Sequence, residues 1–442
     1  MKPLHFFTLL LSALLLFSSC MRESRSVTHA FPEIVPMKDR NSAIGSGEEQ
    51  AYMEETYAKL ADQIRSNPQS LKPRIQMAQF YMVEARATGE HGYYYPAALG
   101  MIESVMKLNP DQERKFEAML LKSSVLLSLH QFAEARSIAE EAISLNGSNS
   151  LIYGALVDAN VELGNYSKAV EMADKMNAIR PDLRSYSRVS YLREIYGEVD
   201  ASVEAMKLAV AAALPGSEEA AWCRLTLGKL HETYGNLSEA EQEYRQILSE
   251  RADYPFAIAA LAEIEHKKGN NDHAEELLKK ACDIIPEVSF YHQLANLYKE
   301  SGRTAEAEKT TKEILEMLAD DEQHGHKMGL EYARVHLDLT GDYAQALKYA
   351  MEEYKTRPDN IDVNKTLAAV YLKTGDVAKA GEHAAKALIT RSRNPEALCL
   401  AGLAQQKSGN TSEGMRLLKS SIKADPYQQH CLADEARALV AM

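Results

Sequence analysis

The sequence has few of the residues that interrupt helices. Its 442 residues include 14 prolines and 22 glycines, whereas alanine, leucine, glutamate and lysine are abundant. A disordered or β-rich chain has a different composition, so these counts indicate an all-helical protein. A chain of this length would ordinarily form two or three globular domains, but that estimate does not apply to a linear array of repeats.

Basic residues are also in the minority. There are 50 lysines and arginines against 63 aspartates and glutamates, which gives a formal net charge of -13. Such a surface repels phosphate backbones, so we expect no nucleic acid among the partners. The acidic balance is otherwise a common setting for solubility.

Cysteine is scarce and unpatterned. The five cysteines are Cys20, Cys223, Cys282, Cys399 and Cys431. None is paired as C-x-x-C, and no Cys/His group has the spacing of zinc ligands, so the sequence predicts no metal site and no cofactor. The last four fall in helical segments, where cysteine usually acts as a small apolar residue. A disulfide between Cys399 and Cys431 stays open, because helix-to-helix bridges need specific geometry.

A hydrophobic run long enough to span a membrane is missing. The apolar stretch from Phe6 to Phe17 is too short for that and follows the positive Lys2, which is typical of a signal-peptide core. The sequence Phe17-Ser18-Ser19-Cys20 comes next. It resembles the lipobox of bacterial lipoproteins, in which a signal peptide (here 1–19) is removed and the cysteine is lipidated.

That resemblance implies a mature protein held to a membrane by acyl chains on Cys20. Each buried methylene contributes about 0.8 kcal/mol, so several chains hold a protein durably. Position 21 is Met and not the Asp that favours inner-membrane retention in such lipoproteins. The expected location is therefore the bacterial cell envelope, at the outer membrane facing the periplasm. An ordinary soluble periplasmic protein is the alternative.

The chain between the anchor and the first repeat has two parts. Residues 20–47 contain prolines, glycines and serines without helical periodicity, which predicts a flexible tether. Residues 48–71 have apolar side chains at helical spacing, among them Tyr52, Leu60 and Ile64. We expect them to form an N-terminal capping helix.

A repeated unit occupies most of the remaining chain. In the stretch from Gly341 to Pro358, a turn glycine is followed five residues later by Ala346, which leaves room for a neighbouring helix. Such turn positions recur at nearly regular intervals, each with a small residue five positions on: Tyr93 with Ala98, His130 with Ala135, Gly164 with Ala169, Gly197 with Ser202, Gly235 with Ala240, Gly269 with Ala274, Gly302 with Ala307, Gly341 with Ala346, Gly375 with Ala380, and Gly409 with Gly414.

This pattern resembles the tetratricopeptide repeat (TPR), a helix–turn–helix unit of about 34 residues. The resemblance covers about residues 72–427. It implies an all-α fold, a right-handed superhelical solenoid of about ten repeats, with residues 428–442 as a C-terminal capping helix. One helical hairpin cannot bury its apolar face alone, so stability comes from the stacked neighbours.

The sequence has none of the nucleotide-binding, hydrolase or zinc-protease motifs that would indicate an enzyme. His324 and His326 lie beside Asp320, Asp321 and Glu322 in an insertion at 319–327. Imidazole and carboxylate can bind a divalent metal, but the interpretation adopted is a polar loop between repeats. We therefore expect no enzymatic activity.

The functional surface of such a solenoid is normally the concave face, which is lined by the first helix of each unit. An aromatic pair with mixed charge suits recognition of a peptide or a helix. Packing between repeats is the alternative role for Trp222. The candidate partner-binding residues are Trp222, Leu225, Lys229, Phe256, Glu263, His266, His292, Asn296 and Lys299.

These features predict a membrane-anchored scaffold that binds other envelope proteins. By resemblance, lipoproteins of this kind serve pilus secretins, outer-membrane protein assembly and exopolysaccharide export. A soluble periplasmic adaptor is one alternative, and an enzyme or a solenoid that binds a small ligand is another. The oligomeric state does not follow from the sequence.

Overall fold

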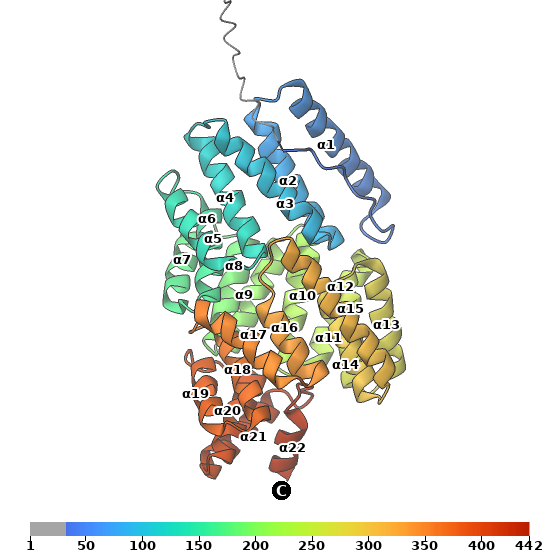
Figure 1. Cartoon of the computed structure of the whole chain (residues 1–442), viewed down its shortest axis with the longest axis vertical. Helices are drawn as coiled ribbons and strands as arrows, with labels where there is room; N and C mark the ends of the chain where they lie inside the picture. Colours follow the sequence, from blue (N-terminus) through green and yellow to red (C-terminus); the bar gives the residue numbers. More distant parts are fainter. Residues whose placement is uncertain (1–31, 442) are drawn as a thin grey trace, which may run out of the picture. The chain divides into compact units, whose positions relative to one another are not determined.

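The chain folds into helices that pack as consecutive antiparallel pairs (Figure 1). A computed structural model describes residues 32–441, and these contain no strand. The helices are α1 (Gly47–Ser66), α2 (Leu71–Thr88), α3 (His91–Lys107), α4 (Gln112–Ser128), α5 (Phe132–Ile143), α6 (Ser150–Glu162), α7 (Tyr166–Ile179), α8 (Leu183–Ile195), α9 (Val199–Ala212), α10 (Glu218–Thr233), α11 (Leu237–Glu250), α12 (Pro255–Lys267), α13 (Asn271–Ile284), α14 (Val288–Glu300), α15 (Thr304–Gln323), α16 (Gly329–Val335), a π-helical segment (His336–Thr340), α17 (Tyr343–Thr356), α18 (Ile361–Thr374), α19 (Val377–Ala387), α20 (Pro395–Lys407), α21 (Thr411–Ala424) and α22 (Ala433–Ala441).

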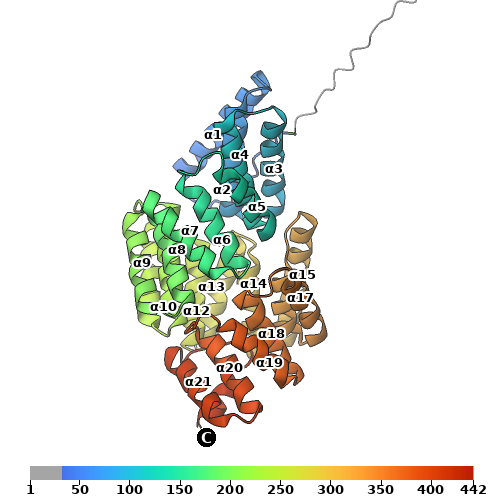
Figure 2. The same cartoon turned by 90° about the vertical axis from the view of Figure 1, so that its left-hand side faces the viewer.

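Helices α2 to α21 make ten pairs, each packed on the next, with α1 before them and α22 after them (Figures 1 and 2). The predicted all-α solenoid of about ten units is therefore confirmed. Among the described helices, none has the length and apolar character needed to cross a bilayer. The predicted signal peptide and Cys20 lie outside the described residues.

The small residues predicted at the helix crossings are buried. Ala98, Ala169, Ala274 and Ala346 have no exposed surface. At another crossing, a Cβ on Gly228 would lie 2.3 Å from the Tyr244 ring, so α10 and α11 approach too closely for any side chain there. These contacts explain why the sequence repeats small residues at a fixed interval.

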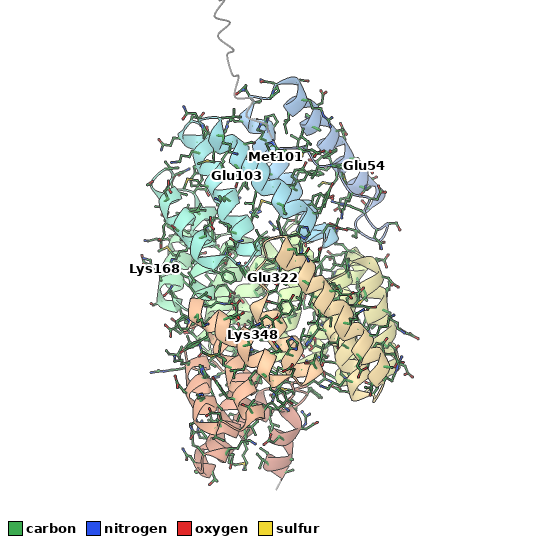
Figure 3. The ribbon with its side chains drawn as sticks, viewed as in Figure 1. Glu54, Met101, Glu103, Lys168, Glu322 and Lys348 are labelled. Carbon is green, nitrogen blue, oxygen red and sulfur yellow. The ribbon has the colours of Figure 1, made fainter. Side chains whose placement is uncertain are left out.

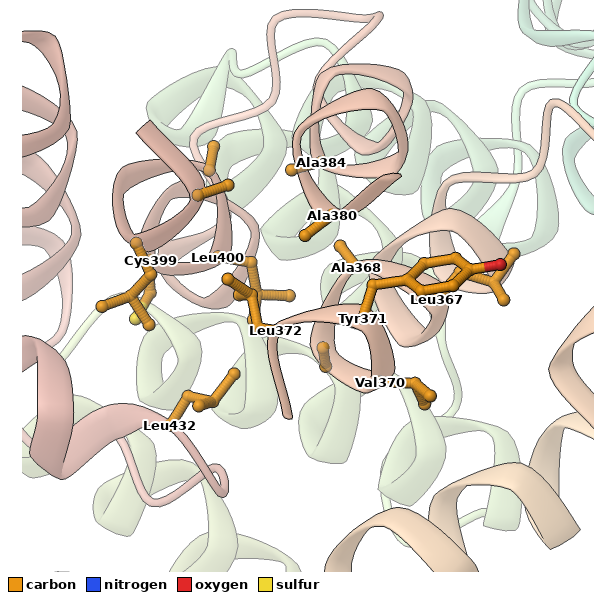
Figure 4. Close-up of a cluster of buried hydrophobic side chains, with 14 of the residues drawn as sticks. Leu367, Ala368, Val370, Tyr371, Leu372, Ala380, Ala384, Cys399, Leu400 and Leu432 are labelled. Carbon is orange, nitrogen blue, oxygen red and sulfur yellow. The ribbon is translucent and has the colours of Figure 1, made fainter. Parts of the chain in front are cut away.

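The core consists of clusters that continue from one pair to the next. In the cluster of Figure 4, Leu367 and Tyr371 from α18 pack with Ala380 from α19 and Leu400 from α20. The buried Cys399 belongs to the same cluster and is a free thiol, as is Cys431, so these two cysteines are not bridged.

The first pair departs from the expected register. Its turn glycine is Gly89, with φ of 74°, and not a turn at Tyr93. Helix α3 begins at His91, so Gly89 lies nine positions before the buried Ala98, whereas Gly164 lies five positions before Ala169. The extra length is about one helical turn, which is why the fixed spacing missed this glycine.

The segment before α1 packs on the repeats. The predicted tether 20–47 is described from Pro32, and this part is held by specific contacts. The backbone oxygen of Val35 accepts hydrogen bonds from the Tyr57 hydroxyl at 3.1 Å and the Tyr81 hydroxyl at 2.9 Å. The Arg40 guanidinium forms a buried ion pair with Glu84. Asn41 also donates to the Asp283 carbonyl at 2.9 Å, so residues 32–46 are fixed to the repeats and are not a free linker.

Residues far apart in the sequence meet repeatedly along the chain. Thr390 donates to the Ile195 carbonyl at 2.6 Å, and the Ile361 amide donates to the Tyr166 hydroxyl at 2.8 Å. The Lys327 amide donates to the Leu129 carbonyl at 3.1 Å. Each of these bonds joins the turn within one helix pair to a loop six pairs further along the chain: the turns after α4, α6 and α8 meet the loops before α16, α18 and α20. Successive turns of the solenoid thus touch along a line that we call the seam: 129–131 on 325–327, 162–166 on 357–361, and 195–197 on 390–391.

Candidate functional site

The predicted partner-binding residues do not line one continuous groove. Most of them belong to three cavities. Trp222 and Phe256 line the tryptophan cavity, of about 960 Å³. Glu263, His266 and Asn296 line the lysine cavity, of about 400 Å³, which also contains Lys267. His292 lines the histidine cavity, of about 1410 Å³. The seam contributes to this division, because loops from the later repeats meet the turns of the earlier ones.

The tryptophan cavity brings Trp222 and Phe256 to one surface. Trp222 on α10 keeps 43% of its surface exposed. Phe256 on α12 is half-buried, with its ring centroid 5.3 Å from that of Phe290. An open aromatic ring surrounded by arginine and carboxylate groups suits binding of another protein. Charged side chains of both signs complete the wall: Arg40, Arg86, Arg184, Arg188, Arg251, Glu49, Glu218, Glu219, Glu250 and Asp253.

Polar side chains in the lysine cavity are engaged with one another. The Lys267 ammonium lies 2.7 Å from a Glu232 oxygen and 3.3 Å from a Glu263 oxygen. Burial alone would lower the pKa of Lys267, but the Glu263 and Glu232 carboxylates raise it above its ordinary value. His266 Nε2 lies 2.9 Å from a Glu300 oxygen. The Lys267–Glu232 and His266–Glu300 pairs join adjacent repeats, so a partner that enters the cavity would have to displace them.

Two predicted site residues have structural roles instead. Leu225 is buried in the core with Tyr244 and Leu261, because its side of α10 faces α11 and α12. The Lys299 ammonium donates to the backbone oxygen of Leu339 at 3.3 Å, in the π-helical segment. Lys229 is exposed and is not among the residues that line the three cavities.

His292 is a neutral imidazole inside the histidine cavity. Burial, aided by the positive charge of Arg334, lowers the pKa of His292 to about 4. Its Nε2 lies 3.6 Å from a carboxylate oxygen of Asp338, and its Nδ1 lies 3.3 Å from the Asn296 amide nitrogen. Burial and the nearby Glu396 raise the pKa of Asp338 to about 6. This wall of the cavity is polar: at neutral pH it combines the uncharged His292 with an ionised Asp338 and the positive charge of Arg334.

The same cavity contains a histidine cluster that the sequence interpretation missed. His91 at the start of α3 meets Asp321 and His326 at the end of α15 and in the loop that follows. Figure 3 labels Glu322, which follows Asp321 near the C-terminal end of α15. The insertion at 319–327 was the available signal, since it holds His324 and His326. His91 lies several repeats earlier in the chain, so its contribution could not be read from spacing.

Burial determines the protonation of this cluster. It lowers the pKa of His326 to about 4, with a further contribution from His91, and it also lowers the pKa of His91. Burial and the neighbouring Asp320 raise the pKa of Asp321 to about 6. At neutral pH the two imidazoles are therefore uncharged and the carboxyl is ionised.

Comparison with known families agrees with the paired helices. Models described as tetratricopeptide repeat match residues 126–194, 257–287 and 288–317. The matched segments are tetratricopeptide repeats, and the helix pairs of the described residues form a solenoid of that type. This fold is a scaffold for protein–protein interactions and is typically non-enzymatic, and none of the matched segments is a catalytic domain. No curated protein matches the chain.

Several solved structures match the chain at low identity and low TM-score. Pseudomonas aeruginosa pilF is 12% identical, with a TM-score of 0.38 over 47% of this chain and 93% of its own. A tetratricopeptide repeat protein from Parabacteroides merdae is 17% identical, with a TM-score of 0.35 over 59% of this chain and 99% of its own. Human IFIT1 is 15% identical, with a TM-score of 0.40 over 87% of this chain and 95% of its own. Likeness at this level says nothing about partners.

Proposed function

We propose that this TPR protein is a non-enzymatic scaffold of the bacterial cell envelope. It binds partner proteins at the tryptophan cavity and is held to a membrane by lipid on Cys20. One observation carries the binding site: Trp222, the only tryptophan in the chain, keeps 43% of its surface exposed beside Phe256. A packing role alone would not require this exposure.

The energetic argument concerns the tryptophan ring. Tryptophan is enriched among the interface residues whose truncation costs about 2 kcal/mol or more, because it buries a large area at low entropic cost. The surrounding charges orient a partner and contribute less to affinity. Recognition by this cavity would therefore depend on Trp222 more than on any single arginine.

In-cell crosslinking tests the binding site. A photo-reactive residue at position 222 is expected to capture a defined partner, whereas the same residue at position 52 is not. Tyr52 on α1 is the matched control, because it is an aromatic residue, 66% exposed, outside the cavity.

The captured partner is then measured against two variants. Trp222→Ala is expected to weaken its binding at least tenfold, and Tyr52→Ala to leave it unchanged. Since Trp222 is the only tryptophan, its fluorescence reports binding directly. Unchanged affinity of a folded Trp222→Ala protein would eliminate this cavity as the site.

The anchor is proposed from the lipobox-like sequence at Phe17–Cys20. Cys20→Ala should abolish labelling by a fatty-acid analogue and release the protein from the membrane fraction. Position 21 favours the outer membrane, which density-gradient separation of the two membranes tests. If wild-type protein is recovered unlabelled in the soluble periplasmic fraction, the soluble adaptor is the better description.

A further inference from the structure

Three side chains that commonly bind metals meet beside the seam. One nitrogen each of His91 and His326 and one carboxylate oxygen of Asp321 lie within 4.8 Å of one another. His91 belongs to the first repeat, and the other two residues to the end of α15 and the following loop. The group therefore joins two successive turns of the solenoid.

The surrounding contacts hold the loop in place. Besides the bond from the Lys327 amide to Leu129, Gln131 donates to the Gly325 carbonyl at 2.9 Å. His130 Nδ1 lies 3.0 Å from the Lys327 carbonyl. The position of His326 is thus fixed by backbone contacts on both sides.

Helix α3 also touches this loop directly. A Cβ on Gly92 would lie 2.7 Å from His324 Nδ1. Because Gly92 follows His91, the absence of a side chain there lets the start of α3 approach the insertion closely.

Ring packing orients the two imidazoles. The His91 ring stacks on Tyr95 at 5.5 Å between centroids, and the His326 ring lies 6.0 Å from His91 and 5.9 Å from Tyr95. The His326 side chain is only 5% exposed. Rings held by packing lose little freedom when they bind an ion, which is what a built site requires.

We propose that His91, Asp321 and His326 bind one divalent transition-metal ion of the Zn²⁺ class. Zinc binds imidazole nitrogen and carboxylate oxygen at about 2.0–2.2 Å, so its ligand atoms lie about 3.4 Å apart in tetrahedral geometry. The three ligand atoms now lie within 4.8 Å of one another, so binding an ion would draw them closer together. A water or a neighbouring histidine supplies the fourth position, since His130 and His324 line the same cavity.

The donor set determines the class of ion. Two imidazoles with one carboxylate suit zinc and similar first-row metals, whereas calcium and magnesium prefer oxygen ligands alone. Thiols in the described part of the chain would compete weakly. Burial raises the pKa of Cys223 to about 11 and that of Cys282, Cys399 and Cys431 to about 12, so these groups stay protonated.

The ion would link two successive turns of the solenoid. It joins α3 to the loop after α15, which otherwise meet through the packing of His91 and Tyr95 on His326. This role is independent of the partner-binding proposal, because Trp222 and Phe256 line a different cavity.

Calorimetric titration of the tag-free, metal-depleted full chain with Zn²⁺ tests the proposal. We expect one ion per chain, with affinity reduced at least tenfold in His91→Gln, Asp321→Asn and His326→Gln. His273→Gln is the matched control. His273 is an exposed histidine 3.3 Å from a Glu265 oxygen, so it offers a two-ligand surface pair without the third group. The control should bind zinc like the wild type.

Cobalt spectroscopy identifies a ligand directly. In His91→Cys, bound Co²⁺ should gain a thiolate charge-transfer band that wild type lacks, even if affinity falls. Hydrogen exchange at residues 324–327 should slow on zinc addition in wild type. Absence of wild-type binding, or binding that survives all three ligand substitutions, would overturn the proposal. Circular dichroism of the metal-free variants separates ligand loss from unfolding.

Discussion

Two contacts of the seam each join a loop of a later repeat to a turn of an earlier one, but they use different side chains. At one, the regular loop at 357–361 meets the turn at 162–166, and an arginine–glutamate pair joins them. At the other, residues 325–327 at the end of the insertion meet the turn at 129–131. There the side chains of His130 and Gln131 bond to backbone carbonyls of the loop, and the Lys327 amide donates to the Leu129 carbonyl.

The difference shows which parts of the array are free to vary. The regular loop leaves no space for additions, because a Cβ on Gly164 would lie 2.5 Å from the Asp359 carbonyl carbon. The insertion carries extra residues without losing the contact, and those residues bring His326 and Asp321 to His91. The regular loop at 357–361 only holds successive turns of the solenoid together, whereas the insertion at 319–327 also brings together side chains that can bind a metal. The following predictions test this distinction.

The largest effect is expected at Gly164. Gly164→Ala combines the strain of φ at 79° with a clash against Asp359, and should cost about 3 kcal/mol or more. Gly341→Ala is the matched control, because Gly341 has φ of 70° and open space around it. It should cost about 1–2 kcal/mol. Urea unfolding measures both, and equal losses would show that the seam adds nothing at Gly164.

The next effect concerns the ion pair of the regular loop. Arg357 Nη1 lies 2.6 Å from a Glu162 oxygen, with the two side chains 5% and 33% exposed. Because Glu162 is partly solvated, Arg357→Ala should cost about 2 kcal/mol and not the full amount for a buried pair. Arg303→Ala breaks a bond of equal length to Glu275, but Arg303 is 39% exposed. It should cost less than Arg357→Ala in the same urea experiment, because solvent screens this pair.

The last prediction concerns the dependence of stability on pH. Burial and Asp362 raise the pKa of Glu194 to about 7 from an ordinary 4.5. Between pH 4.5 and 7 the Glu194 carboxyl stays protonated in the folded chain but is ionised in the unfolded chain. The stabilisation from protonated Glu194 is therefore complete below pH 4.5 and is lost as the pH rises toward 7. Glu194→Gln should flatten that decline in melting temperature.

Glu287 lines the histidine cavity and allows the same test in the region of the insertion. Burial and Asp321 raise the pKa of Glu287 to about 7. Glu287→Gln should therefore flatten the decline in the same direction. A decline that steepens in either variant would contradict the assigned cause.

Much of the candidate site lay beyond sequence reasoning, for identifiable reasons. Trp222 and Phe256 line one cavity, and their role in binding a partner stays a prediction. Leu225 was wrongly placed there, because a position that faces the groove in one unit can face the core in another. The tether prediction failed to anticipate the contacts of residues 32–46, since Val35 and Arg40 bind groups that only the folded first repeat assembles.

The amino-acid sequence alone determined the helix pairs, their number and the small residues at their crossings, because these follow from local periodicity and from contacts between adjacent repeats. Only the tertiary structure decided what meets across the seam. Contacts such as Arg357 with Glu162, and His91 with His326, join residues that lie several repeats apart. They depend on the accumulated angle between successive repeats, and a small change per repeat would move every one of them apart.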